Sequence, residues 1–200
     1  MIVHTWCVNL DVPAETVAAL SATLSPDECD RGARLRFARD RERFVVTRGV
    51  LRRLLGRYLD MPPGDIRFAY NAFGKPELDP TLDSRLQFNV SHSADLALIA
   101  ITTDAAVGVD LECIRPQPDG PEIARSVIST ADVERLNSTP SDRYDEAFLS
   151  CWTKKEAYVK ARGESVADAS GDSDESGRWS LYQFNPAPGY VGAVVVERGA

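Results

Sequence analysis

Apolar residues recur along this chain with two different periods, and the change from one period to the other predicts the order of helices and strands. Between residues 41 and 59 the period is close to four, in two adjacent rows. The first row is Val46, Val50, Leu54 and Tyr58, and the second is Thr47, Leu51, Leu55 and Leu59. This spacing predicts a long amphipathic helix over 41–59 with its arginine side chains on the outside.

Shorter patterns predict the remaining elements. Helices are expected at 13–20, from Ser25 onward, at 122–127 and at 141–162, and strands at 2–10, 66–70, 179–184 and 190–196. In the middle of the chain, residues 88–93 lead into the apolar run 96–101, a turn at 102–104 and a strand at 107–112. We interpret the last two runs as a hairpin whose second strand contains an acidic pair.

The strand at 107–112 places two carboxylates on one face. Because side chains alternate along a strand, Asp110 and Glu112 point to one side while Val109 and Leu111 point to the other. Alternating acids of this kind usually mark a face in contact with water. Their interpretation therefore depends on what else lies near them.

The predicted helix at 141–162 adds a third acidic group. Trp152, Glu156 and Lys160 are spaced by four residues, so one helix face presents an indole, a carboxylate and an ammonium group. A single Glu–Lys pair at this spacing is usually a surface ion pair. Three carboxylates from two elements, however, suit a hard cation such as Mg²⁺, which shares its coordination shell with waters and substrate phosphates.

Four motifs occur in a fixed order between about Ser25 and Gly163. They are Gly74-Lys75-Pro76, Asn89-Val90-Ser91-His92-Ser93, Gly108-Val109-Asp110-Leu111-Glu112 and Trp152-Thr153-Lys154-Lys155-Glu156-Ala157 continuing to Lys160. Together they resemble the 4′-phosphopantetheinyl transferases, and the larger single-chain class is the closer match. The resemblance implies an α+β fold with two similar lobes in one chain, related by a pseudo-twofold axis, and an active site in the cleft between them.

The same resemblance implies a reaction and a metal site. The family transfers 4′-phosphopantetheine from coenzyme A to a serine of an acyl or peptidyl carrier protein and releases 3′,5′-ADP. By this likeness Asp110, Glu112 and Glu156 hold Mg²⁺, or Mn²⁺, against the coenzyme A pyrophosphate, and Lys160 neutralises the leaving phosphate. Glu156 is the candidate general base, directly or through water, so the expected catalytic residues are Glu156, Lys160 and Asp110.

The resemblance also implies contacts with coenzyme A. Ser91 and His92 match the family's phosphate contacts, and Lys75 is similar to its lysine near the same nucleotide. Arg31 falls near the 3′-phosphate of the adenine nucleotide and Arg48 near the same ligand. A histidine that follows a strand end also has a structural interpretation, in which it bonds a nearby backbone carbonyl.

The turn near Thr103 is the expected boundary between the lobes. Residues 1–103 would form an N-terminal lobe with the arginine-rich helix and the hairpin that contacts coenzyme A, and residues 104–200 a C-terminal lobe with the metal-binding carboxylates. Residues 164–177 are rich in Ser, Gly, Asp and Glu and lack Lys and Arg. This composition predicts a flexible acidic loop, at a point where the family continues into an apolar strand.

Charge is unevenly distributed. Between residues 31 and 57 there are ten arginines against two acids, a local balance of +8, whereas the whole chain has a net charge of −7, so the remainder has −15. This asymmetry predicts an anionic partner, such as coenzyme A or an acidic carrier protein. A pI near 4.9 disfavours general binding to nucleic acid or membranes.

Composition limits the classes of protein and of metal site that the chain can represent. With 200 residues and 44% hydrophobic content, the chain can bury a sizeable core. Its four cysteines form no C-x-x-C pair, and with only two histidines a zinc site is not expected. There is no basic leader and no apolar run of about 20 residues, which predicts a cytoplasmic protein. Two lobes in one chain make a monomer sufficient.

Three functions are compatible with these observations. The first is an active phosphopantetheinyl transferase. The second is a non-catalytic module that binds coenzyme A or a carrier protein. The third is a Mg²⁺-dependent hydrolase that splits the coenzyme A pyrophosphate with water in place of serine.

Overall fold

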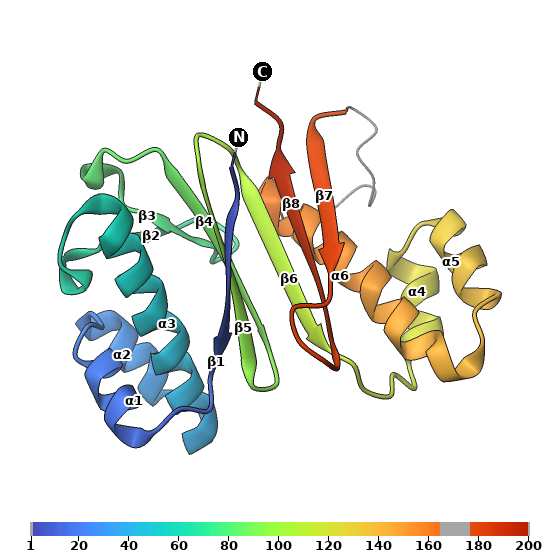
Figure 1. The fold of residues 1–200 in the computed structure, drawn as a ribbon, viewed down its shortest axis with the longest axis horizontal. Coiled ribbons are helices and arrows are strands. Elements are labelled where there is room, and N and C mark those ends of the chain that lie inside the picture. The colour runs from blue at the N-terminus through green and yellow to red at the C-terminus, as the bar shows by residue number, and fades with distance from the viewer. Residues whose placement is uncertain (1, 165–176, 200) are drawn as a thin grey trace.

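The computed structural model describes residues 2–164 and 177–199 and has a mixed α+β fold, as predicted (Figure 1). Its first half contains β1 (His4–Asn9), α1 (Ala14–Ser21), α2 (Pro26–Ala33), α3 (Ala38–Leu59), β2 (Phe68–Tyr70), β3 (Pro76–Leu78), β4 (Leu86–Ser93) and β5 (Leu96–Thr103). Its second half contains β6 (Val107–Cys113), α4 (Gly120–Val127), α5 (Thr130–Asn137), α6 (Tyr144–Arg162), β7 (Trp179–Phe184) and β8 (Tyr190–Glu197).

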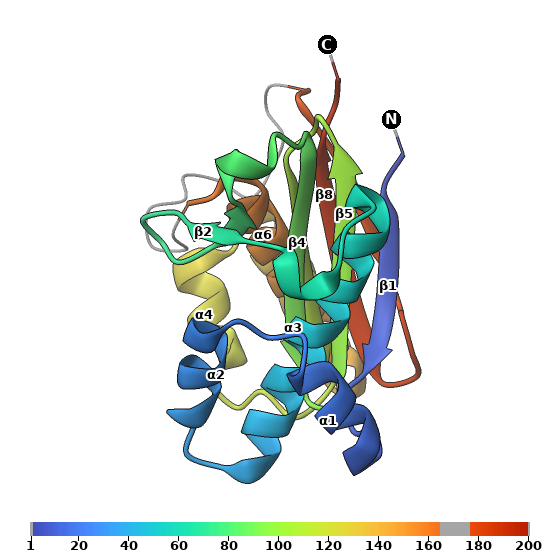
Figure 2. The ribbon, with the colours of Figure 1, turned by 90° about the vertical axis from the view of Figure 1, so that its left-hand side faces the viewer.

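The first three-stranded sheet has the order β1-β5-β4 and is antiparallel throughout. β4 and β5 form a hairpin that turns at Ala94, where φ is 50°, and Asp95. The three helices of this half lie in front of the strands in Figure 2. The apolar stripe of α3 packs on this sheet, as its period predicts. The shared core consists of Leu51, Leu55, Ile66, Phe88, Ile99 and Ile101.

The predicted hairpin between residues 96–101 and 107–112 is wrong. β5 is already paired on both edges, with β1 and with β4, so it has no free edge to offer to the next strand. The chain turns instead at Asp104, where φ is 63°, and begins a new sheet with β6, which pairs with β8. The acidic pair therefore lies on an edge strand of the second sheet, whose order is β6-β8-β7.

α6 packs very closely on β6 because of a glycine in the strand. A Cβ atom at Gly108 would lie only 2.0 Å from the carbonyl oxygen of Ala157 and 2.3 Å from the backbone nitrogen of Ala161. Both are backbone atoms of α6 and neither can rotate away, so only glycine permits this approach. The contact fixes the helix that contains Glu156 and Lys160 against the strand that contains Asp110.

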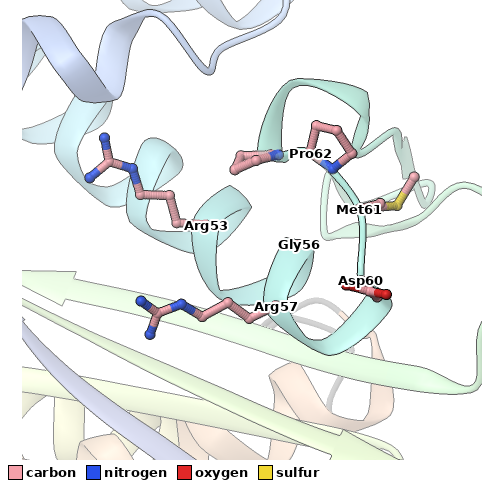
Figure 3. A pocket seen from close by; sticks show the side chains of 7 residues that line it. Arg53, Gly56, Arg57, Asp60, Met61 and Pro62 are labelled. Carbon is pink, nitrogen blue, oxygen red and sulfur yellow. The ribbon is translucent and has the colours of Figure 1, made fainter.

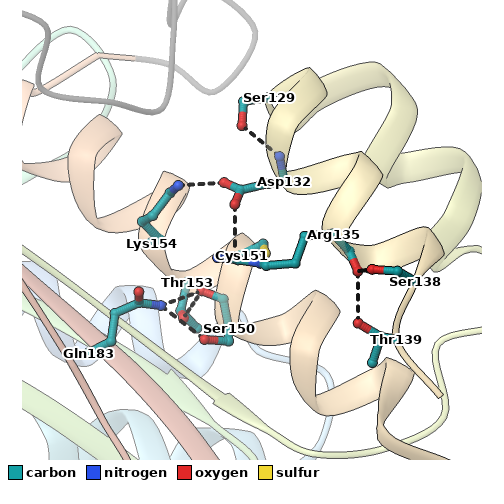
Figure 4. Close-up of polar contacts among 10 residues, drawn as sticks. All are labelled: Ser129, Asp132, Arg135, Ser138, Thr139, Ser150, Cys151, Thr153, Lys154 and Gln183. Carbon is teal, nitrogen blue, oxygen red and sulfur yellow. Dashed lines mark hydrogen bonds and ion pairs between the residues drawn. The ribbon is translucent and has the colours of Figure 1, made fainter. Parts of the chain in front are cut away.

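α5, which the sequence patterns did not predict, is fastened to α6 by polar contacts (Figure 4). The buried Asp132 accepts a hydrogen bond from Lys154 Nζ at 2.5 Å and forms an ion pair with Arg135 at 2.9 Å. Ser129 caps the helix by accepting a hydrogen bond from the backbone N–H of Asp132. Lys154, in the middle of a motif, therefore has a structural partner.

The two three-stranded sheets share an apolar core. It consists of Leu98, Ala100, Val107, Val109, Leu111, Tyr190 and Val194.

The three-stranded sheets of the two halves have the same strand order. In each half the first strand pairs with the last strand, and the last strand also pairs with the strand that precedes it in the chain. The pseudo-twofold relation between two lobes remains a prediction. The acidic loop predicted at 164–177 falls, except for its two end residues, on residues 165–176, which lie outside the described residues. No helix within residues 2–164 and 177–199 is long and apolar enough to cross a membrane.

Candidate functional site

β4 and β6 belong to different sheets but are joined by side chains along their length. Asn89 Oδ1 accepts a hydrogen bond from the backbone N–H of Val109 at 2.8 Å, and Ser93 Oγ accepts one from the backbone N–H of Cys113 at 3.1 Å. Alternate residues of β4 thus supply the acceptors that a neighbouring strand would otherwise supply. We call this junction the β4–β6 seam, and the acidic pair lies along it.

Asp110 is at the centre of the seam and is 3% exposed. Its Oδ1 accepts hydrogen bonds from Lys160 Nζ at 2.6 Å and from Ser91 Oγ at 2.7 Å, and the two donors are 3.2 Å apart. Its Oδ2 is buried and has no hydrogen-bond partner among the described residues. A buried carboxylate oxygen without a donor is costly, so this atom is an acceptor that a ligand or cation would satisfy.

Glu112 and Glu156 lie in the same electrostatic environment. Burial raises the pKa of Glu112 above its usual range, and the nearby Asp110 raises it further, while a hydrogen bond from Ser93 Oγ at 2.7 Å opposes the rise. Burial also raises the pKa of Glu156; Asp110 and Glu112 add to the rise, whereas Lys160 opposes it. The three carboxylates are therefore close enough to repel one another.

These side chains are not gathered into a finished coordination shell. No group of three or more His, Cys, Asp or Glu side chains is arranged to hold a metal ion in the part of the chain that the structure describes. An unpartnered buried Asp110 oxygen beside two further carboxylates nevertheless fits Mg²⁺, which typically takes one or two protein carboxylates and fills its shell with phosphates and waters.

A cavity of about 740 Å³ opens beside the seam and draws its walls from both halves of the chain. It brings together three of the predicted coenzyme A contacts, Arg31, Arg48 and His92, with Glu112. Burial lowers the pKa of His92, and the positive charges of Lys160 and Arg43 lower it further, so the imidazole is neutral near pH 7. Arg31 lies near Arg48, and we call this part of the cavity its basic end; Glu112 lies near Arg115 instead.

The prediction that the arginines of α3 all lie outside is wrong for Arg48 and Arg52. Arg52 is 1% exposed and Arg48 is 9% exposed. Both are drawn inward by the buried carboxylate of Glu28, which lies 2.6 Å from Arg52 Nε and 3.3 Å from Arg48 Nε. Periodicity cannot reveal this, because the counter-charge comes from a different helix.

Lys75 contacts the backbone of the second half of the chain. Its ammonium group donates hydrogen bonds to the carbonyl oxygens of Lys160, at 2.7 Å, and Val107, at 3.3 Å. The turn before it is held by Asn71 Oδ1 and by Gly74, where φ is 79°. Lys75 thus bonds its loop to the backbone of β6 and α6, and its contact with the nucleotide stays a prediction.

Other arginines of α3 line a separate cavity of about 630 Å³ at the end of the helix. Figure 3 shows Arg53 and Arg57 extending from successive turns of α3, beside the segment that contains Asp60 and Pro62. None of the predicted site residues lines this cavity. The arginine cluster seen in the sequence is therefore divided between the site and an unrelated surface.

Sequence reasoning missed several residues of the site. Asn89 and Ser93 were part of a motif but were assigned no role, and their signal was the alternation of polar residues along β4. Arg115 and Phe44 also line the cavity, and no sequence pattern marks them. Glu28 falls in the helix predicted from Ser25 onward but was assigned no role.

Comparison with known proteins covers nearly the whole chain. Residues 12–104 match the family described as "4'-phosphopantetheinyl transferase, N-terminal", and residues 106–189 match the "4'-phosphopantetheinyl transferase superfamily". The 4′-phosphopantetheinyl transferase HetI of Nostoc is 38% identical, with 97% of this chain aligned to 87% of that protein. A putative 4′-phosphopantetheinyl transferase of Synechocystis is 33% identical, over 92% of this chain and 74% of the relative. The transferase Sfp of Bacillus subtilis is 26% identical, over 72% of this chain and 62% of its own length.

Proposed function

Because this chain belongs to the 4′-phosphopantetheinyl transferase superfamily and is a transferase of that kind, we propose that it moves 4′-phosphopantetheine from coenzyme A to a serine of an apo acyl or peptidyl carrier protein. The other product is 3′,5′-ADP. The observation that most supports this proposal is the buried Asp110 carboxylate, bonded to Lys160 and Ser91 and open at Oδ2, beside a cavity with basic walls.

In this proposal residues 1–103 and 104–200 form two lobes, and coenzyme A lies in the cavity between them. Mg²⁺, or Mn²⁺ in its place, held by Asp110, Glu112 and Glu156, would offset negative charge on the diphosphate and orient it. The cavity walls account for the rest of the ligand. Arg31 and Arg48 would face one anionic group, and the neutral His92 would donate a hydrogen bond to another. Ser91, whose hydroxyl proton is donated to Asp110, would lie beside the same phosphates.

The chain's own residues then act on the reacting atoms. The carrier serine oxygen attacks the phosphorus of the phosphopantetheine group, and the bond from that phosphorus to the oxygen of 3′,5′-ADP breaks. Glu156 takes the serine proton, directly or through one water. Lys160, fixed by Asp110 and Ser91, offsets the charge that develops on the departing phosphate oxygen.

The variant Glu156→Gln tests this assignment. It removes the proposed base and one metal ligand, so carrier modification should fall at least about 100-fold while the folded state is retained. Glu146→Gln is the matched control, because Glu146 is an exposed residue in the first turn of the same helix. Transfer at the wild-type rate by Glu156→Gln would remove Glu156 from the chemistry.

The two alternative functions make different predictions. A hydrolase would split coenzyme A without any carrier protein, and a binding module would bind coenzyme A without turnover in the presence of Mg²⁺. The comparisons do not favour either, because the matched families and the relatives described above are transferases.

A further inference from the structure

Glu28 is a buried carboxylate that lies behind the basic end of the cavity. It is 1% exposed, and its Oε2 accepts hydrogen bonds from the backbone N–H of Ser25, at 3.0 Å, and from Arg52 Nε, at 2.6 Å. Its Oε1 forms an ion pair with Arg48, 3.3 Å from Nε, but has no hydrogen-bond partner among the described residues. One carboxylate thus serves a helix cap and two arginines.

Arg52 holds this carboxylate in place. Its Nη1 donates to the carbonyl oxygens of Pro63, at 3.0 Å, and Ile66, at 2.8 Å, and its guanidinium lies over the ring of Phe68. Because Arg52 is fully buried and bonded to backbone at two points, the position of Glu28 is fixed from the side away from the cavity. Arg52 is therefore an anchor and does not reach a ligand.

Arg48 is held on one edge only. Glu28 lies against its Nε, and its guanidinium lies near the rings of Phe44 and Phe68. Among the described residues, no hydrogen bond or ion pair engages its two terminal nitrogens, and Arg48 lines the cavity. Arg31, which lies over the ring of Tyr70, is on the same wall. The wall thus offers two guanidinium groups to an anion.

Coenzyme A carries two anionic groups, a diphosphate and a 3′-phosphate. The diphosphate contains the bond that breaks, so it must lie near Asp110 and Lys160, toward the end of the cavity that contains His92 and Glu112. Of the other two arginines that line the cavity, Arg43 is paired with Asp11 and Arg115 lies near Glu112, so Arg31 and Arg48 are left for the 3′-phosphate. A guanidinium binds a phosphate best when two of its N–H groups point at it together, which requires a fixed orientation.

We propose that Glu28 is a positioning residue that aims Arg48 at the 3′-phosphate of coenzyme A, an inference that rests on the transfer reaction proposed above. Glu28 touches no substrate in this arrangement. It acts by holding the Nε edge of Arg48, so that the two terminal nitrogens face the cavity.

The variant Glu28→Gln would disturb this arrangement in a defined way. Two hydrogen-bond donors and the Arg48 ion pair converge on the carboxylate, whereas a glutamine amide is uncharged and offers one acceptor oxygen and an NH₂ group that is itself a donor. One of the arginines must then face a donor. Arg52 keeps its two carbonyl partners, so Arg48, which has no other hydrogen-bond or ion-pair partner among the described residues, is the one that moves.

The test compares coenzyme A with 3′-dephospho-coenzyme A as substrates for an apo carrier protein. For Glu28→Gln, kcat/KM with coenzyme A should fall about 10- to 100-fold, mainly through KM, and kcat/KM with the dephospho substrate should change less than about twofold. Ser25→Ala is the matched control. It removes the other half of the same helix cap without touching Arg48, so it should keep the wild-type ratio between the two substrates.

A double-mutant cycle with Arg48→Met separates positioning from a general effect on the fold. If Glu28 acts through Arg48, adding Glu28→Gln to Arg48→Met causes no further loss of preference for coenzyme A. Should Glu28→Gln fail to fold, Glu28→Asp, which keeps the charge and withdraws it by one methylene, is expected to cause a smaller loss with the same selectivity.

The inference is overturned if the Glu28 variants lose activity equally with both substrates, if they lose none, or if the losses in the cycle add. It is also overturned if the wild-type enzyme does not prefer coenzyme A to the dephospho form. A wild-type protein that modifies no carrier with either substrate contradicts the proposed function instead, so the two failures are distinguishable.

Discussion

Lys160 and Lys154 offer a matched pair of perturbations on one helix. Each of these two lysines of α6 forms an ion pair with a buried aspartate, Lys160 with Asp110 at 2.6 Å and Lys154 with Asp132 at 2.5 Å. Only the first pair lies at the seam. The variants Lys160→Met and Lys154→Met each remove an ammonium group and keep a similar side-chain volume, so they compare the same kind of loss at two places.

The partners that each aspartate would keep determine how much unfolding free energy each variant should lose. Asp110 without Lys160 would keep only Ser91 as a donor, with Oδ2 still unpartnered, so a nearly uncompensated buried charge remains and costs about 3–5 kcal/mol of unfolding free energy. The Asp132 carboxylate without Lys154 would keep its ion pair with Arg135 and a side-chain hydrogen bond with Ser129, so the cost is nearer about 1–2 kcal/mol.

Activity should separate the two variants more sharply than stability. If Lys160 offsets charge on the departing phosphate, Lys160→Met loses about 10²–10³-fold in kcat, the usual effect of removing one such donor. Lys154→Met should keep kcat within about twofold, because its partner lies on α5 and away from the cavity. Urea denaturation gives the stabilities, and intact mass of a carrier protein over time gives the rates. A Lys160→Met enzyme that is folded and retains the wild-type kcat would refute this reasoning.

Three further predictions follow from other parts of the site. Gly108→Ala should destabilise the protein by about 3 kcal/mol or more in urea denaturation, because the new Cβ would meet backbone atoms of α6 within 2.3 Å; an unchanged midpoint would contradict the close packing of α6 on β6. Ser93→Ala removes the hydroxyl that donates to Glu112 Oε2 and should raise the Mg²⁺ concentration needed for half-maximal rate; an unchanged requirement would separate Ser93 from the metal site. Lys75→Met should lower the unfolding free energy by about 1–3 kcal/mol while KM for coenzyme A stays within about twofold, because Lys75 bonds the backbone of β6 and α6; a large rise in KM alone would support its predicted contact with the nucleotide.

Much of the fold follows from local patterns in the sequence. The row of apolar residues on α3, the start of α2 at Ser25 and the strands β7 and β8 were all predicted within a few residues, because each depends on periodicity or capping within one segment. The pairing of β5 was not predicted correctly, because adjacent strands separated by a short turn usually form a hairpin. Here the remote strand β1 occupies the edge of β5 that the next strand would need.

The site shows the same division between local and remote information. Alternation along β6 placed Asp110 and Glu112 on one face, and helical spacing placed Glu156 and Lys160 on one face. The sequence patterns could not identify the partner of each group, because that partner lies on another element. Asp110 is bonded by Ser91, Lys75 donates to the Lys160 carbonyl, and Arg48 is paired with Glu28. Buried charge is set by contacts between distant segments, and a hydrophobic pattern cannot show which arginine is buried.

The most direct test of the account is the mass of an apo carrier protein after incubation with this protein, coenzyme A and Mg²⁺, beside the same mixture with EDTA. Peptidyl and acyl carrier proteins should be tried separately. We predict that the carrier gains the mass of one phosphopantetheine group, that 3′,5′-ADP appears in equal amount and that EDTA prevents both. A carrier that stays unmodified while coenzyme A is split, or while coenzyme A is bound and left intact, would contradict the proposed transfer.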